Sequence, residues 1–256
     1  MKNIPPDIKE FLDEKALQYN TTRFIEPDPV SIPHGFDTKQ DIEISGFLTA
    51  TIAWGGRGTI LKNAGRMMSL MDNAPFDFVM GHTQADLGRL KSFVHRTFNG
   101  DDLVYFMEAL KNIYLYHGGL EGVFSDHITG TSTQEAITRF REVFFSLPHP
   151  VRTTKHVSDP ARGSAAKRIN MYLRWMVRRD NRGVDFGLWE RISPGQLSCP
   201  LDVHSGNVAR KLGLITRSQN DAKALAELDF NLRQMDALDP VKYDFALFGL
   251  GVFEKF

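Results

Sequence analysis

The sequence has a single cysteine, Cys199, among 256 residues. One cysteine excludes an intramolecular disulfide framework and a four-cysteine iron–sulfur cluster. Cys199 has no evident histidine and asparagine partners, so a cysteine nucleophile is not expected. None of the eight histidines has another histidine four positions away, which argues against a helical metal site. We therefore predict neither a bound metal nor a cofactor.

Long apolar runs and a charge excess are also absent. No stretch of 18 apolar residues occurs, and the first fifteen residues have no apolar segment of signal-peptide type. We expect a soluble, cytoplasmic protein with no membrane partner. Lys plus Arg and Asp plus Glu number 31 each. This balance counts mildly against a DNA-binding protein, although a local basic patch can replace a global excess.

Such a patch lies between residues 152 and 182, which hold nine Lys or Arg and two Asp. Much of it belongs to a predicted amphipathic helix over residues 165–177. Two interpretations are open from composition alone. The cations form a surface that faces phosphates, or they form an ordinary solvated helix face.

Strand patterns are weak, because the sequence shows no strong alternation and no Asn-Gly hairpin signal. Helical periods predict an all-α fold, with helices over residues 7–19, 41–53, 59–71, 87–94, 101–114, 133–145, 165–177, 220–235 and 241–250. Asp239 and Pro240 have the residue types of an N-cap and a first helical residue. We expect a monomer with two lobes, one over about 41–150 and one over about 151–256, with residues 1–40 packing across them.

A glycine-rich segment, Trp54-Gly55-Gly56-Arg57-Gly58, separates two of the predicted helices. It is not a phosphate-binding P-loop, because it lacks a preceding strand and a Gly-Lys-Ser/Thr ending. The glycines suit a tight turn. Trp54 and Arg57 keep a functional interpretation open.

Several segments together resemble the helix–hairpin–helix DNA glycosylase superfamily. Residues 163–170 (GSAAKRIN) resemble the junction at which a hairpin opens a helix. Residues 201–204 (LDVH) and the helix after them resemble a Val-Asp-Thr-His segment, and residues 239–249 resemble the next helix. Residues 50–57 stand where the superfamily has a turn that fills the gap left by a flipped base.

The same sequence departs from that pattern in three places. Ala165 stands where the hairpin usually has its second glycine, and no glutamine occupies the turn at Gly55 and Gly56. Residues 181–198 form an insertion relative to the endonuclease III-like members, and archaeal 8-oxoguanine glycosylases are more similar in this respect. The segments LRWMVR and PLDVH also resemble a bacterial family of unknown function.

The resemblance implies a two-lobed helical fold of the glycosylase type, a duplex DNA partner with a damaged base, and a role for two residues. Lys167 would be the nucleophile of a bifunctional enzyme and Asp202 its catalytic carboxylate. The remaining implied sites fall into two groups. Residues expected to contact DNA are Arg57, Arg162, Gly163, Ser164, Arg168, His204 and Arg210. Residues expected to line the base pocket or act as a wedge are Trp54, Gly55, Gly56, Trp175 and Trp189, with Phe186 as a further aromatic candidate.

The chemistry suits this pair. A lysine must be neutral to attack the sugar C1′, so the site should desolvate Lys167 and lower its pKa, and Arg168 would act in the same direction. Asp202 at a helix N-terminus would stay ionised and stabilise the positive charge that develops as the base leaves.

Simpler interpretations remain beside this one. Lys167 is otherwise a surface lysine in a first helical turn, and Asp202 is otherwise the N-cap of the helix that starts at Val203. His204 could bind phosphate, orient Asp202 or cap the helix. The chain could be a catalytically inactive nucleic-acid-binding module of the same fold, or a helical enzyme that acts on free nucleosides.

Overall fold

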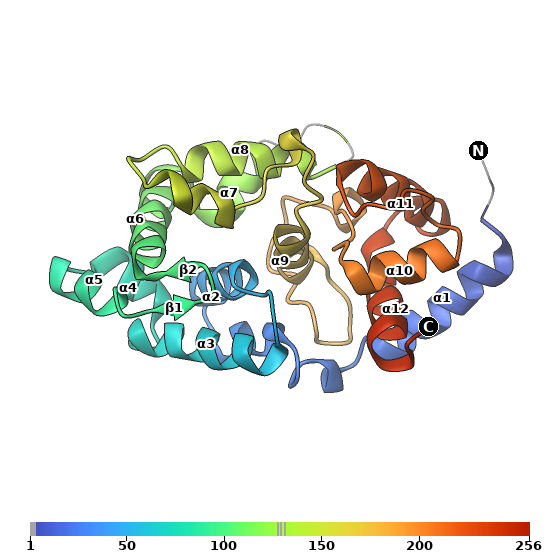
Figure 1. Cartoon of the computed structure of the whole chain (residues 1–256), viewed down its shortest axis with the longest axis horizontal. Helices are drawn as coiled ribbons and strands as arrows, with labels where there is room; N and C mark the ends of the chain where they lie inside the picture. The colour runs from blue at the N-terminus through green and yellow to red at the C-terminus, as the bar shows by residue number, and fades with distance from the viewer. Residues whose placement is uncertain (1–3, 127, 129, 131) are drawn as a thin grey trace. The chain divides into compact units, whose positions relative to one another are not determined.

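The computed structural model describes residues 4–126, 128, 130 and 132–256. It confirms the all-α prediction: within these residues the only sheet is a two-stranded antiparallel ribbon of β1 (Val94–His95) and β2 (Phe98–Asn99) (Figure 1). The chain divides into two compact units. Unit 1 comprises Met1–Phe24, Ile128–Glu135 and Asp159–Phe256, and unit 2 comprises Ile25–His127 and Ala136–Ser158.

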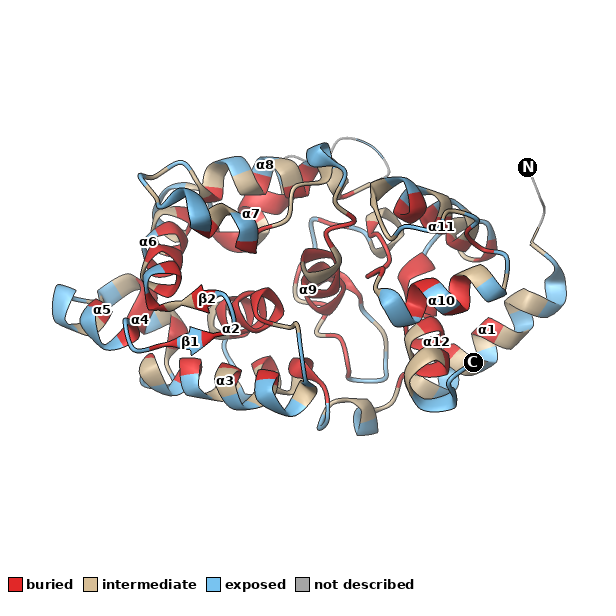
Figure 2. Ribbon diagram, viewed as in Figure 1, coloured by how far each residue is buried: buried red, intermediate tan, exposed pale blue. Residues whose placement is uncertain are grey.

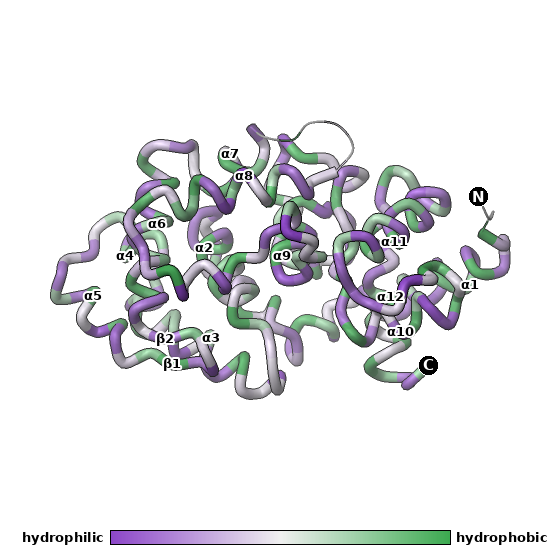
Figure 3. Tube along the Cα trace, turned by 45° about the horizontal axis from the view of Figure 1, so that its top comes forward, coloured by the Kyte–Doolittle hydropathy of each residue, from purple (hydrophilic) through white to green (hydrophobic). Residues whose placement is uncertain are grey.

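Unit 2 is built around an aromatic core. The rings of Phe106 and Phe144 lie 4.7 Å apart, and Phe47 packs edge-on against Phe140 and Phe144. Along the helices that supply these rings, hydrophilic and hydrophobic residues alternate in short stretches (Figure 3). The helical elements associated with unit 2 are η2 (Pro29–Ser31), η3 (Pro33–Gly35), α2 (Lys39–Thr51), α3 (Arg57–Leu70), α4 (Pro75–Gly81), α5 (Gln84–Leu90), α6 (Gly100–Tyr116), α7 (Gly119–Ser125), most of α8 (Gln134–Phe144) and η4 (Val151–His156).

The ribbon was not predicted. We expected a helix over residues 87–94, but α5 ends at Leu90 and the chain turns back at Arg96, whose φ is 55°. Phe93 and Phe98 are buried on either side of the turn, with ring centroids 6.0 Å apart. Burial of two aromatic rings therefore overrides the local helical preference.

Unit 1 holds three of the segments singled out from the sequence, residues 163–170, 201–204 and 239–249. A second hydrophobic cluster joins its N- and C-terminal helices and includes Leu12, Val208, Leu225 and Leu247. The elements of this unit are α1 (Pro6–Tyr19), η1 (Thr22–Phe24), η5 (Pro160–Arg162), α9 (Lys167–Val177), η6 (Pro194–Gln196), α10 (Val203–Lys211), α11 (Ala222–Met235), η7 (Pro240–Lys242), α12 (Tyr243–Gly249) and the π-helical η8 (Leu250–Glu254).

Helix α12 ends at Gly249, within one residue of the predicted end at 250, and the chain continues directly into the π-helical η8, which ends at Glu254. A Cβ added at Gly249 would lie 2.1 Å from a ring carbon of Tyr19. Gly249 is therefore required for the close approach of α1 to α12, because any side chain would collide with the Tyr19 ring.

Helix α9 is buried on nearly all sides (Figure 2). Two cations of this segment fit neither interpretation, since Arg174 is only 3% exposed and Arg178, the C-cap residue of α9, only 4%. Arg174 pairs with Asp185 at 3.2 Å and with Asp244. Their guanidinium groups are neither on a solvated face nor on a surface that could meet phosphates.

Arg178 makes the larger set of ion pairs. It lies 2.6 Å from Asp180, 3.1 Å from Asp185 and 2.9 Å from Asp239. Burial by itself would lower the pKa of Arg178, but Asp185 and Asp239 more than offset this and raise it. Asp239 occupies the N-cap position of η7 as expected, yet its side chain makes no cap hydrogen bond and binds Arg178 instead.

The first testable consequence concerns this network. The substitution Arg178→Met leaves the fully buried Asp185 and its neighbours short of a counter-charge. We expect a loss of about 3 kcal/mol in the free energy of unfolding, measured by urea denaturation. Arg162→Met is the control, because its side chain is 82% exposed and we expect a change of about 0.5 kcal/mol or less. Equal losses in the two variants would contradict a structural role for the network.

A second consequence concerns Asp229 on α11, whose carboxylate accepts a hydrogen bond from the Cys199 amide at 2.9 Å. Burial raises the pKa of Asp229 from 3.8 to about 6, although Ser198 and Cys199 donate hydrogen bonds that lower it. Between these two pH values only the folded protein keeps the proton. The contribution of Asp229 to the free energy of unfolding is therefore fully present below pH 3.8 and is lost as the pH rises through 6.

The substitution Asp229→Asn removes that titration. At each pH the free energy of unfolding of both proteins is measured by urea denaturation. We expect the difference, variant minus wild type, to increase by about 3 kcal/mol from acidic to neutral pH. The other titrating groups contribute equally to the pH dependence of both proteins, so their contributions cancel in the difference. A difference that does not change with pH would show that Asp229 titrates normally in the folded protein.

Candidate functional site

A short hairpin delivers the chain into α9. Gly163 has a φ of 86°, and its carbonyl accepts a hydrogen bond from the Ala222 amide at 3.0 Å, which fixes the hairpin to the start of α11. The Ser164 hydroxyl accepts a hydrogen bond from the Ala166 amide at 3.1 Å. Ala166 is buried and adopts a left-handed conformation, φ 43° and ψ 39°, at a cost of about 1 kcal/mol. The tertiary contacts thus impose a turn that the residue at 166 does not itself favour.

Lys167 lies in the first turn of α9, as predicted, and is its first residue, because the helix begins two residues later than the predicted start at 165. Its Nζ lies 3.4 Å from the Met171 sulfur. Within the described part of the chain this is the only partner of the amine, and the side chain is partly buried. Arg174 and Arg178 on the same helix are each matched by carboxylates. Lys167 is therefore a cation of α9 without an ion pair among the described residues.

Asp202 is the N-cap of α10, as the simpler interpretation predicted. Its Oδ1 accepts a hydrogen bond from the Ser205 amide at 2.9 Å, and the Ser205 hydroxyl accepts one from the Asp202 amide at 2.9 Å. The Asn220 side-chain amide donates to the Asp202 carbonyl at 2.7 Å. Oδ2 has no donor among the described residues, so one carboxylate oxygen fixes the helix and the other stays available.

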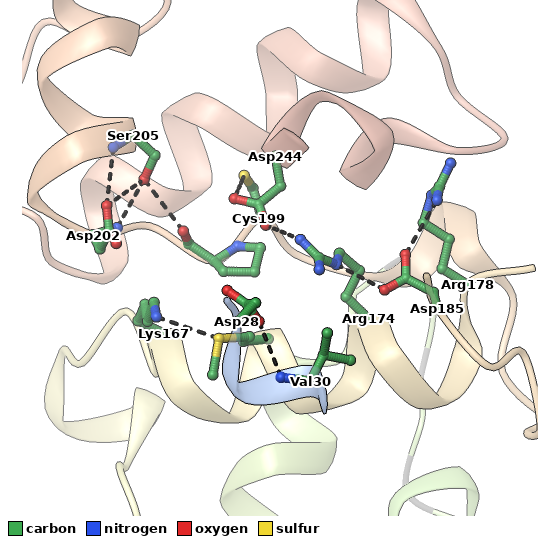
Figure 4. Close-up of polar contacts among 12 residues, drawn as sticks. Asp28, Val30, Lys167, Arg174, Arg178, Asp185, Cys199, Asp202, Ser205 and Asp244 are labelled. Atoms are coloured by element: carbon green, nitrogen blue, oxygen red, sulfur yellow. Dashed lines mark hydrogen bonds and ion pairs between the residues drawn. The ribbon is translucent and has the colours of Figure 1, made fainter. Parts of the chain in front are cut away.

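The buried carboxyl of Asp244, on α12, connects these two residues electrostatically. Burial raises its pKa to about 6, the positive charges of Arg174 and Lys167 lower it, and the negative charge of Asp202 raises it. Lys167 and Asp202 therefore both act on one carboxyl. We call Lys167, Arg174, Cys199, Asp202 and Asp244 the polar cluster (Figure 4).

Cys199 is a neutral member of the polar cluster. Its Sγ lies 3.9 Å from Asp244 Oδ1. Burial, together with the charges of Asp244 and Asp229, raises the pKa of the thiol well above its ordinary value. A buried thiol that is so hard to ionise is a poor nucleophile.

The residues expected to contact DNA have different surroundings. Arg162 is exposed at the hairpin, 3.8 Å from Asp159, and burial lowers the pKa of Arg168 to about 10, so it remains a cation at neutral pH. His204 is exposed in the first turn of α10, edge-on to Phe248. Arg210 donates to the Arg217 carbonyl at 2.8 Å and to the Asn220 side chain, and it thereby fixes the loop after α10.

Residues 54–57 belong to unit 2. Gly55 has a φ of 109°, Gly56 is the N-cap of α3, and Arg57 is its first residue, so the segment forms the tight turn that its glycines suggested. Trp54 packs edge-on against His95 and under the guanidinium of Arg96, 5.0 Å from its ring. Arg96 could not be selected from the sequence, because the ribbon that carries it was not predicted.

The other two tryptophans are buried in unit 1. Trp175 is 0% exposed and Trp189 is 1% exposed. Trp189 packs edge-on against Tyr172, with ring centroids 5.6 Å apart. The Phe186 amide donates to the Trp175 carbonyl at 2.8 Å, which ties the inserted segment to α9. A wedge must be exposed to enter DNA, and both indoles are occupied by core packing.

Three members of the site were missed from the sequence: Met171, Asp244 and Ser205. Asp244 carried a usable signal, because it is a charged residue between Tyr243 and Phe245 in an otherwise apolar helix. A carboxylate in such a position is buried and needs a partner. Ser205 stands three residues after Asp202, which is the spacing of a capping box.

Two other kinds of feature are absent from the described ranges. Among those residues no group of three or more His, Cys, Asp or Glu side chains is placed to hold a metal ion. No helix there is long and apolar enough to cross a membrane.

Comparison with known proteins gives one match. No curated protein and no solved structure matches the chain. Residues 28–253 match the family described as "Protein of unknown function (DUF2400)". That range takes in most of both units and every member of the polar cluster, and the chain therefore belongs to this family.

Proposed function

We propose that the chain is a DNA base-excision N-glycosylase with Schiff-base lyase activity, with Lys167 as the nucleophile and Asp202 as the catalytic carboxylate. The observation that supports this most directly is the polar cluster. Lys167 and Asp202 are far apart in the sequence, yet both act on the buried carboxyl of Asp244. The resemblance to the helix–hairpin–helix glycosylases selected the same two residues on independent grounds.

The environment of Lys167 suits a nucleophile. A surface lysine engaged in an ion pair would have to break it before reacting, whereas the only hydrogen-bond partner of this amine among the described residues is a thioether. After losing a proton to solvent or a carboxylate, the amine attacks C1′ of the sugar. The bond from C1′ to the base breaks with its electrons going to the base, which takes up the proton that the attacking nitrogen gives up once it is bonded to C1′.

Asp202 would act on the charge that develops in this step. Positive charge grows on the sugar as the base departs, and a fixed carboxylate oxygen stabilises it. The capping hydrogen bonds hold Asp202 through Oδ1 and leave Oδ2 available. The lysine adduct then opens the sugar to a Schiff base, and loss of the proton at C2′ eliminates the 3′ phosphate.

The hairpin would provide the contact with DNA. Arg162 is exposed beside Gly163, and Arg168 remains charged near the start of α9. Cations on either side of the hairpin would bind the phosphates that flank an extruded nucleotide. A damaged base, such as an oxidised purine, is the expected substrate because such a base is extruded at lower cost.

A second candidate is a nucleic-acid-binding module that lacks the chemistry. The observation in its favour is that helix capping accounts for the Asp202 position without any catalytic role. Such a module would bind DNA with a steep salt dependence and release no base.

The decisive experiment is borohydride trapping on duplexes that carry an abasic site or a damaged base, 8-oxoguanine included. We expect a covalent adduct with the wild type and at least a hundredfold loss in Lys167→Met, because the adduct forms through this amine. Lys223→Met is the matched control: Lys223 lies in the first turn of α11, is exposed and should keep full trapping. Equal trapping by the two variants would refute the role of Lys167.

A separate prediction distinguishes capping from catalysis at Asp202. Asparagine preserves an oxygen that accepts from the Ser205 amide, so Asp202→Asn should change the free energy of unfolding by about 0.5 kcal/mol or less, whereas Asp202→Ala should lose about 1 kcal/mol. We expect both variants to release the damaged base about a hundredfold more slowly in single-turnover assays, because both lack the charge. Base release at the wild-type rate by Asp202→Asn would leave capping as the sole role.

A further inference from the structure

Unit 2 carries a concentration of positive charge that lies outside both the polar cluster and the hairpin. Residues 57–71 and 87–100 contain six Lys or Arg and no Asp or Glu, in a chain whose opposite charges number 31 each. The first range covers α3 and its C-cap, and the second holds the two-stranded ribbon. An ordinary solvated surface mixes charges of both signs, so a region this long without an acidic residue calls for an explanation.

The two segments lie side by side in the fold (Figure 1). The Asn63 side-chain amide of α3 lies 2.8 Å from Nδ1 of His95 in β1. The Arg66 guanidinium donates a hydrogen bond to the Ser92 carbonyl, just before β1, at 3.0 Å. The cations of α3 and those of the ribbon therefore belong to one surface of unit 2.

Helix α3 contributes two exposed cations to this surface. Its apolar residues, Ala64 and Met67 among them, are buried, whereas Lys62 and Arg66 lie on the opposite side of the helix and are exposed. Lys62 and Arg66 are four residues apart, and like charges at this spacing destabilise a helix. Since α3 contains no acidic residue to offset the repulsion, a bound polyanion would stabilise it.

Two further cations, Lys91 and Arg96, stand on either side of β1, and both are exposed. The Arg96 guanidinium lies over the Trp54 ring, 5.0 Å from its centroid. A Cβ added at Gly55 would lie 2.8 Å from an Arg96 nitrogen, so the glycine leaves room for this arginine. We call the four cations the basic face: Lys62, Arg66, Lys91 and Arg96. None of them pairs with a carboxylate among the described residues.

We infer that the basic face is a second nucleic-acid contact of this protein and binds the sugar-phosphate backbone of duplex DNA outside the damaged nucleotide. Phosphates bind to Lys and Arg side chains, and here no neighbouring carboxylate competes with them. The choice of DNA as the partner rests on the proposed function, whereas binding through this face needs no chemistry at Lys167.

A duplex fits this surface better than a single strand. Proteins that bind single strands present aromatic side chains on which unpaired bases stack. Helix α3 and the ribbon are described throughout, and they expose no aromatic side chain. A surface of exposed cations without exposed rings can contact the backbone of a duplex and leave its bases stacked.

The test measures affinity for a short undamaged duplex by fluorescence anisotropy between about 50 and 200 mM salt. The variant K62Q/R66Q removes the two charges on α3, and K91Q/R96Q removes the two beside β1. The matched control is K39Q/R139Q. It also removes one exposed Lys and one exposed Arg from unit 2, but these two pair with Glu121 and Glu142.

We expect each basic-face variant to bind the duplex about tenfold more weakly than the wild type at about 100 mM salt. The slope of log affinity against log salt should become shallower by about 1.8, because two phosphate contacts are lost at about 0.9 each. The control should stay within about twofold of the wild type. Wild-type affinity in either basic-face variant, or an equal loss in the control, would overturn the inference. Tighter binding to a single strand of DNA or RNA than to the duplex would also overturn it.

A second measurement needs no variant, so it applies even if a substitution disturbs folding. The wild-type protein is acetylated with acetic anhydride in the presence and absence of the undamaged duplex, and the modified lysines are identified by mass spectrometry. We expect the duplex to protect Lys62 and Lys91 and to leave Lys39 as reactive as before. Full reactivity of Lys62 and Lys91 in the complex would contradict the inference.

Borohydride trapping by the wild type separates this inference from the proposed function. If the wild type forms no adduct on any damaged or abasic duplex, the proposed function fails, and binding to the undamaged duplex still decides the role of the basic face. If the wild type forms an adduct but the basic-face variants bind the undamaged duplex as the control does, the inference fails and the proposed function stands.

Discussion

The burial of two arginines in one helix is the constraint on which unit 1 depends. Arg174 and Arg178 cannot lose their hydration unless carboxylates replace it, and those carboxylates come from separate parts of the chain: Asp180 and Asp185 after α9, and Asp239 and Asp244 around the start of α12. Removal of one partner from such a set leaves an uncompensated buried charge. The network therefore fixes both the rotation of α9 about its axis and its register against α12.

The candidate site is a consequence of that fixed rotation. The face of α9 that presents Arg174 to Asp244 also presents Met171 and Lys167, since these residues are one and two turns away. Arg174 and Arg178 have carboxylate partners, while the Met171 sulfur is the only hydrogen-bond partner of the Lys167 amine in the described chain. The same interactions that stabilise the unit thus leave Lys167 without an ion pair among the described residues, at the position to which the proposed function assigns the nucleophile.

Much of this could be predicted from the sequence because the relevant signals are local. The helical spacing of apolar residues predicts the all-α class. Asp202 is followed three residues later by Ser205, which is the spacing of a capping box. The burial of Arg174 and Arg178 could not be predicted in this way. Cations at helical spacing resemble a solvated face, and their partners at Asp239 and Asp244 lie more than sixty residues away. Ala166 in a left-handed turn and Gly249 against Tyr19 were missed for the same reason, because tertiary contacts impose both.

The contact between Tyr19 and Gly249 also bears on how the chain folds during synthesis. Helix α1 is synthesised before its partner α12, with more than two hundred residues between them. Every residue of unit 2 has been translated by Ser158, whereas unit 1 cannot close until α12 has followed. During that interval Leu12 and Ala16 have no native surface to cover them. Long sequence separation of this kind slows folding and prolongs the exposure of apolar surface, so the apolar face of α1 stays open to aggregation until α12 has been made.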